Sequence, residues 1–200
     1  MLGEQVYFPV ANTGFGPGLA FGEPTWYAIH TMGRHEKRVT TYLQEERILA
    51  FLPLIEQLHR WSDRHCRVEV PLFGCYVFVR IVPTVDNRLR VLRTPGVLGF
   101  VGSRKQGAPI AEQEMESLRT VVRSKAPLQT HPYVNTGKRV RIRGGSLDGV
   151  EGIIQYEGTD RSLVLSIELL RRSVSIRVEG YDVELVERGA GTNWMRKGTP

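Results

Sequence analysis

Residues 137–185 constrain the fold of this chain more than any other stretch. The stretch opens GKRVRIRGGSLDGVEGII, in which Val140 and Ile142 alternate with arginines at the two-residue period of a half-buried strand. Glycine pairs and an Asp-Gly step supply turns, and three further alternating runs follow. About five short strands in roughly 50 residues predict a closed SH3-like barrel, because closure removes exposed sheet edges.

The region before this block has strand and helix patterns in alternation. Residues 26–30 and 97–101 are typical of strands, and residues 72–79 form a β-branched and aromatic run expected of a central strand. Amphipathic helices are predicted at residues 34–51 and 112–124. The fold class expected for the whole chain is α+β, with an antiparallel sheet and flanking helices followed by the barrel.

A short helix is predicted after Pro83. Val85, Leu89 and Leu92 repeat at i, i+4 and i+7, so they are expected to form its buried face. The arginines at positions 88, 90 and 93 are expected to face elsewhere.

Composition shifts divide the chain into two domains and three connecting or terminal segments. Residues 1–24 are rich in glycine and proline and predict a flexible lead, and residues 126–136 have two prolines and no period, as in a linker. The expected boundaries are a lead at 1–24, a first domain at 25–125, a linker at 126–136, a second domain at 137–188 and a disordered tail at 189–200.

The net charge of +6 is confined to the first domain. Residues 26–125 carry 16 Lys and Arg against 10 Asp and Glu, whereas residues 137–188 carry nine of each. A basic domain beside a neutral one predicts that the first approaches a polyanion. The charge is equally compatible with a general aid to solubility.

Several classes of protein are disfavoured. No apolar run reaches the length of a membrane helix, the start lacks the pattern of a signal peptide, and two cysteines fit a reducing cytoplasm. The five histidines show no paired ligand spacing, and no phosphate-binding or nucleophile motif lies between a strand and a helix. We therefore expect a cytoplasmic protein that is not an enzyme and has no metal or cofactor.

Four segments together resemble the NusG/RfaH family of transcription elongation factors, which join an NGN domain to a KOW domain. They are WYAIHTMGRHEKRV at 26–39, PLFGCYVFVR at 71–80, RTPGVLGFVGS at 93–103, and the opening of the barrel. The resemblance covers roughly residues 25–186. It implies a monomeric factor that binds the clamp helices of the largest RNA polymerase subunit through its NGN domain and suppresses pausing or termination.

The resemblance also implies which residues make contact. Phe73, Tyr76 and Phe78 match the family's polymerase-facing aromatics, and His30 matches the aromatic position that ends the first strand. Asn87 and Arg88 match by position the segment that touches the opposing lobe of the polymerase cleft. The alternative is that the four ring-bearing side chains pack the core.

A second set concerns nucleic acid. Arg34, His35, Lys37 and Arg38 begin the first helix and are candidates to approach the non-template DNA strand, through contacts that are salt-sensitive and indifferent to sequence. The alternative for these four residues is a solvated helix face.

Two departures from the family pattern point to a specialised, operon-specific paralogue. Gly74 and Cys75 stand where housekeeping NusG has proline and glycine, so the local bend is expected to differ. Gly180 stands where a bulky apolar residue helps to bind a ribosomal protein or Rho, which leaves the partner of the KOW domain open.

A rival interpretation is an RNA-binding or ribosome-associated module that uses the barrel itself. Arg139, Arg141 and Arg143 are expected on one strand face, with Tyr156 and Tyr181 as stacking groups. The zero net charge of the barrel argues against this interpretation.

Overall fold

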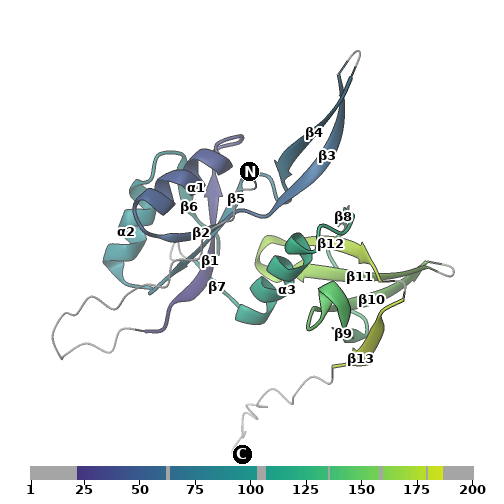
Figure 1. Ribbon diagram of the computed structural model, residues 1–200. Coiled ribbons are helices and arrows are strands. Elements are labelled where there is room, and N and C mark those ends of the chain that lie inside the picture. The colour runs from purple at the N-terminus through teal and green to yellow at the C-terminus, as the bar shows by residue number, and fades with distance from the viewer. Residues whose placement is uncertain are drawn as a thin grey trace, which may run out of the picture. The chain divides into compact units, whose positions relative to one another are not determined.

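The computed structural model of the protein describes residues 22–61, 64–102, 107–134, 136–157, 160–178 and 180–186. It consists of two compact units, Met1–Met115 and Glu116–Pro200 (Figure 1). Helices and antiparallel sheets confirm the α+β class. The expected disordered tail and most of the expected flexible lead lie outside the described residues. No helix in the described ranges is both long and apolar enough to cross a membrane.

The first unit is built on an antiparallel sheet with the strand order β2-β5-β1-β6, to which a short strand β7 adds by pairing with β1. The central position of β5 confirms the prediction from its β-branched and aromatic sequence, although the strand begins only at Tyr76. The elements are β1 (Thr25–Thr31), α1 (Glu36–Glu45), β2 (Leu49–Phe51), β5 (Tyr76–Ile81), α2 (Val85–Arg93), β6 (Val97–Phe100) and β7 (Pro109–Ile110).

One face of this sheet carries the core of the unit. Tyr27 and Ile29 of β1 alternate inward with Val77 and Val79 of β5, and they form one buried cluster with residues of α1, α2 and β6, among them Val39. The opposite face carries Trp26, Ala28 and Phe78, which are also buried. Both faces of β1 and β5 are therefore largely closed to solvent.

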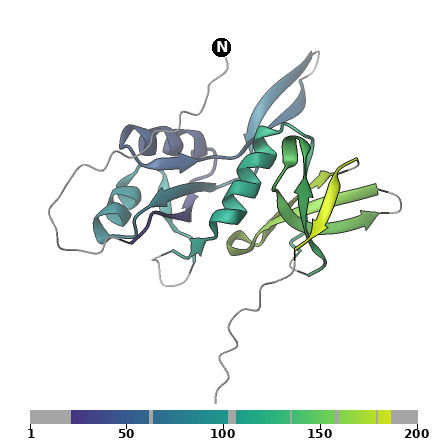
Figure 2. The same cartoon turned by 60° about the horizontal axis from the view of Figure 1, so that its bottom comes forward.

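Two strands form an arm that pairs with no other strand among the described residues. Strands β3 (Leu54–Trp61) and β4 (Arg64–Pro71) make an antiparallel pair that projects from the first unit in both views (Figures 1 and 2).

Helix α1 is shorter than expected. It ends at Glu45 because Arg47 takes a left-handed backbone conformation with φ of 57°, which breaks the helical hydrogen-bond series. Residues 49–51 are extended rather than helical, because they form strand β2. In this strand, Leu49 pairs with Arg80 of β5.

Helix α2 presents the opposite face from the one predicted. Its N-cap is Thr84, whose hydroxyl accepts a hydrogen bond from the Asn87 N–H at 3.2 Å. The side buried toward the sheet carries Val91, and the guanidinium of Arg88 lies over the rings of Tyr27 and Phe100. The aliphatic residues expected in the core are exposed instead: Val85, Leu89 and Leu92.

Helix α3 (Glu112–Arg123) has nearly the predicted bounds, and the division between the two units falls within it. In the first unit, Glu112 accepts a hydrogen bond from Trp26 Nε1 at 3.2 Å and lies 3.4 Å from Arg80. In the second unit, the Ser117 hydroxyl accepts the Glu151 N–H at 3.1 Å.

The predicted linker is not a structureless connection. Residues Leu128–His131 form strand β8, which pairs with strand β12 (Arg172–Arg177) in the register Val174 opposite Thr130. The reason is that β12 has an open edge whose backbone groups the segment satisfies. The expectation of a linker over residues 126–136 is therefore corrected for residues 128–131, which belong to the second sheet.

The second unit is a six-stranded antiparallel sheet with the order β13-β9-β10-β11-β12-β8 (Figure 2). The five strands expected after residue 137 are all present, and Val140 and Ile142 are buried as their alternation predicts. Closure of the sheet into a barrel stays a prediction. The remaining strands are β9 (Arg139–Arg143), β10 (Glu151–Glu157), β11 (Asp160–Ile167) and β13 (Asp182–Leu185).

Candidate protein-binding surface

Two aromatic side chains lie side by side where β1 ends and β5 begins. His30 is directly opposite Tyr76 in the antiparallel register, and their ring centroids are 5.4 Å apart at an interplanar angle of 37°. His30 is exposed and Tyr76 is partly exposed. The structure thus brings together two of the residues that the sequence selected as candidate contacts.

The loop before Tyr76 is held by a buried carboxylate. Cys75 adopts a left-handed backbone with φ of 67°, and its carbonyl accepts the Thr31 N–H at 2.9 Å. The Cys75 N–H donates to Glu36 Oε1 at 2.7 Å, and Glu36 is buried at the start of α1. A charged acceptor in a buried site makes a strong hydrogen bond, so Glu36 stabilises the backbone that positions Tyr76.

We predict that Glu36→Ala lowers the free energy of unfolding of the first unit by about 1–3 kcal/mol, because the partly buried Cys75 N–H loses its acceptor. Urea denaturation followed by the amide signals of β1 and β5 measures the change. Glu36→Gln, which keeps an acceptor oxygen, should cost less. The matched control is Glu45→Ala on the exposed end of the same helix, expected within about 0.5 kcal/mol of the parent. Equal effects of Glu36→Ala and Glu45→Ala would contradict this role.

Apolar side chains that sequence reasoning missed lie at the same end of the sheet. Met32 and Leu98 are exposed, and the Met32 N–H donates to the Gly96 carbonyl at 2.8 Å. Gly99 is opposite His30 and has open space where a side chain would stand. We call His30, Met32, Tyr76 and Leu98 the strand-end surface. Local pattern gave no sign that Met32 and Leu98 are exposed, because Met32 directly follows β1 and Leu98 lies within β6.

Phe73 and Phe78 do not belong to this surface. Phe78 is 0% exposed and Phe73 is 5% exposed, and their rings meet edge to face with centroids 6.3 Å apart. The ring of Phe51 also packs against Phe78, with ring centroids 6.3 Å apart. For these two residues, packing is the interpretation that the structure supports, because side chains closed to solvent present no area to a partner.

Asn87 and Arg88 serve the local structure of α2. The Asn87 side-chain amide donates to the Val82 carbonyl at 3.0 Å. The guanidinium carbon of Arg88 lies 5.2 Å from the Tyr27 ring centroid and 5.7 Å from that of Phe100, a cation–π arrangement. Both side chains are half-buried and already bound to groups of the first unit, so neither is fully available to a partner protein.

The four basic candidates at the start of α1 differ in their surroundings, and only Lys37 and Arg38 lie within the helix, because it begins at Glu36. Arg34 is exposed, with φ of 63°, and Arg38 is exposed with its guanidinium 3.2 Å from the Tyr42 hydroxyl. Lys37 donates to the Glu69 carbonyl of β4 at 2.9 Å. His35 is half-buried, with Nδ1 3.1 Å from the Gly33 carbonyl oxygen. Three of the four therefore present positive charge to solvent beside the β3–β4 arm.

The arginines of β9 share one strand face, as predicted, but two of them have carboxylate partners. Arg141 Nε donates to Glu151 at 2.9 Å, and Arg143 Nε donates to Glu184 at 2.7 Å. The hydrogen bond and charge of Glu151 raise the pKa of Arg141 above its ordinary value. These pairs reduce the free positive charge that an RNA-binding stripe requires.

In the residues that the structure describes, no three His, Cys, Asp or Glu side chains gather as a metal site requires.

Comparison with known proteins finds the following similarities. The family model "Transcription termination factor nusG" matches residues 24–119. A Lactococcus lactis protein, "Transcription termination/antitermination protein NusG", is 28% identical over 183 residues, covering 81% of this chain and 93% of the relative. A protein of the same name from Halalkalibacterium halodurans is 25% identical over 177 residues, covering 82% and 99%. A solved structure, "Domain interaction in Thermotoga maritima NusG", is 22% identical with a TM-score of 0.46, covering 82% and 98%.

Proposed function

Because this chain is a NusG-family factor, similar to proteins of transcription termination and antitermination, we propose that it binds RNA polymerase through its first unit and suppresses pausing or termination. The site that we propose is the strand-end surface, and its target is the pair of clamp helices on the largest polymerase subunit. The observation that carries the proposal is the His30–Tyr76 pair, with His30 exposed and Tyr76 partly exposed, next to the Cys75 backbone that Glu36 holds.

The physical case rests on how this surface is built. Binding energy at protein interfaces is concentrated in a few aromatic anchors, and tyrosine is among the commonest. A ring that is already held in position loses little conformational entropy when a partner covers it. The loop restraint at Cys75 and the contact with the His30 ring supply that preorganisation for Tyr76.

We further propose that Arg34, Lys37 and Arg38 approach the non-template DNA strand when the factor is bound. All three side chains are exposed, Arg34 just before α1 and Lys37 and Arg38 in its first turn, and contacts with phosphates of this kind weaken as salt rises. We also propose that the factor acts in the cytoplasm on particular operons rather than on all transcription. Gly180 supports it, because this exposed position offers no side chain to a ribosomal protein or to Rho.

We predict that Tyr76→Ala weakens binding to RNA polymerase by about 5- to 150-fold, which corresponds to about 1–3 kcal/mol for an aromatic anchor. Binding of the labelled full chain to polymerase from its own host measures the effect. His30→Ala should weaken binding less. A double-mutant cycle should show coupling of about 0.5–1.5 kcal/mol between the two rings.

The matched control is Tyr156→Ala, which removes an exposed tyrosine from β10 of the second unit and should leave polymerase binding unchanged. Amide spectra of each variant test whether its fold persists. If a folded variant lacking both His30 and Tyr76 rings bound polymerase as the parent does, the strand-end surface would be excluded as the site.

A further inference from the structure

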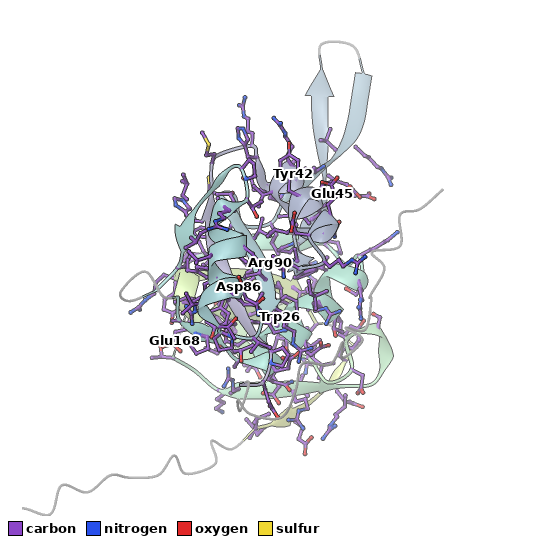
Figure 3. All side chains as sticks on the ribbon, turned by 90° about the vertical axis from the view of Figure 1, so that its left-hand side faces the viewer. Trp26, Tyr42, Glu45, Asp86, Arg90 and Glu168 are labelled. Carbon is purple, nitrogen blue, oxygen red and sulfur yellow. The ribbon has the colours of Figure 1, made fainter. Side chains whose placement is uncertain are left out.

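The outward side of α2 carries an apolar stripe that is open to solvent. Val85, Leu89 and Leu92 follow one another along the helix and are 76%, 42% and 41% exposed. Figure 3 looks onto the side of the first unit that carries this helix, with Asp86 and Arg90 labelled. Single exposed aliphatic residues are common on proteins, but three in one line form a patch that favours a partner. We call these three residues the α2 stripe.

Two opposite charges lie along one flank of the α2 stripe. Asp86 directly follows Val85, Arg93 directly follows Leu92, and both charged side chains are exposed. They are seven residues apart, which is about two helical turns, so they lie on the same side of the helix axis. Within the described part of the chain, neither of them forms an ion pair. The flank therefore has an acidic end and a basic end.

The other two arginines of α2 are engaged within the first unit. Arg90 donates to the Glu46 carbonyl at 2.5 Å and lies 3.5 Å from the Glu46 carboxylate. The guanidinium of Arg88 lies over two aromatic rings of the core. Arg93 is thus the arginine of this helix whose guanidinium has no partner among the described residues.

This arrangement of apolar and charged groups is complementary to itself. When two copies of a helix pack antiparallel about a twofold axis, the first turn of one lies beside the last turn of the other, and residues of the same flank stay together. Asp86 of each copy then lies beside Arg93 of the other, which gives two ion pairs. The Leu89 side chains of the two copies meet near the axis, with Val85 of one copy beside Leu92 of the other.

We propose that the α2 stripe is a self-association surface, and that its occupant is the α2 stripe of a second copy of this chain, packed antiparallel. One helix face is smaller than the roughly 800 Å² per partner of a standard interface, so the dimer is weak, with a dissociation constant on the order of 100 μM. Dilute samples are then mostly monomeric, as the family resemblance implies. The pair forms where the local concentration of the factor is high.

The net charge of +6 does not prevent this contact. At physiological salt, exposed charges farther apart than about 8 Å are largely screened from one another, so the groups close to the contact decide whether it is attractive. On the exposed side of α2 these are Asp86, Arg93 and Arg90, and Arg90 is paired with Glu46. Their charges sum to zero. No residue of the strand-end surface takes part, so this proposal and polymerase binding can fail independently.

The first test is sedimentation equilibrium of the full chain between about 10 μM and 1 mM, a range that brackets the expected dissociation constant. The mass should rise from that of one copy toward that of two. Leu89→Glu should weaken association on the order of tenfold or more, because it buries a charge at the centre of the contact. The matched control Val68→Glu on β4, where Val68 is 40% exposed, should leave association unchanged. A parent chain that stays monomeric at the highest concentration would overturn the proposal, as would equal effects of the two glutamate variants.

An exchange of charges tests the antiparallel arrangement. Asp86→Arg and Arg93→Asp should each weaken association on the order of tenfold, because each variant places like charges side by side in its own dimer. An equimolar mixture of the two variants should associate as the parent does, because each supplies the charge that the other lacks. Loss of association through unfolding of α2 would not be reversed by mixing, and amide spectra of each variant check its fold. If folded variants gave no association when mixed, the proposal would be rejected.

Discussion

Replacing Phe78 with alanine is expected to lower the free energy of unfolding of the first unit by about 3–5 kcal/mol. Phe78 lies in the central strand β5 and is 0% exposed, with its ring packed against those of Phe73 and Phe51. Truncation removes the apolar contacts of a whole ring and leaves a cavity that a central strand cannot close, because its neighbours on both sides are hydrogen-bonded to it.

Urea denaturation followed by the amide signals of β1 and β5 provides the measurement. Phe78→Leu, which retains most of the apolar volume, should cost only about 1 kcal/mol. Tyr76→Ala, two residues earlier on the same face but partly exposed, should cost clearly less than Phe78→Ala. If Phe78→Ala were as stable as the parent, the ring would not be a structural element, and a binding role for Phe78 would have to be reconsidered.

Replacing Gly152 with alanine is expected to destabilise the second unit by at least about 2 kcal/mol, in the upper part of the range for overpacked sites. A Cβ atom at Gly152 would lie 2.7 Å from the Val164 carbonyl oxygen and 2.9 Å from Leu163 Cγ. The oxygen belongs to the backbone of β11, which is paired with β10 from Ile153 onward, so it moves only if the pairing is distorted. Position 152 of the GVEGII sequence therefore requires glycine for a steric reason, because a side chain there would collide with β11.

Hydrogen exchange of peptides from β10, β11 and β12 measures this effect in the full chain, because it reports on the second unit alone. The matched control is Gly74→Ala in the first unit, where a Cβ would have no atom within 4 Å. That change should be neutral or stabilising by up to about 1 kcal/mol. Parent-like exchange in Gly152→Ala would show that β10 and β11 can separate by several tenths of an ångström without cost.

Much of the fold was predictable from local patterns. The alternation of Val140 and Ile142 gave the buried face of β9, and the charge order along residues 112–123 gave α3 within one residue. The β-branched run before Arg80 predicted a central strand. These predictions succeeded because they depend on neighbours in the chain, whose spacing determines which side chains share a face.

Of the candidate site, the family resemblance named His30 and Tyr76, but it also named Phe73 and Phe78, which are buried. Tyr76 and Phe78 have the same strand parity and so the same face, yet one is partly exposed and the other is closed to solvent. In α2, the sequence predicted that the side carrying Leu89 is buried, because that side is the more aliphatic. The structure buries the side carrying Val91 instead. Glu36 was not selected, because its hydrogen-bond partner at Cys75 is 39 positions away in the chain.

Taken alone, the amino-acid order determined the element types, the two-part organisation and the likeness to one family, because periodicity, turns and motif spacing are properties of short segments. The tertiary structure alone decided which ring of β5 reaches solvent, which side of α2 packs, and that residues 128–131 join the second sheet. Each of these depends on what lies across the sheet or beside the helix. The groups across the sheet or beside the helix come from residues distant in sequence. A pattern within one short segment cannot predict where those residues lie.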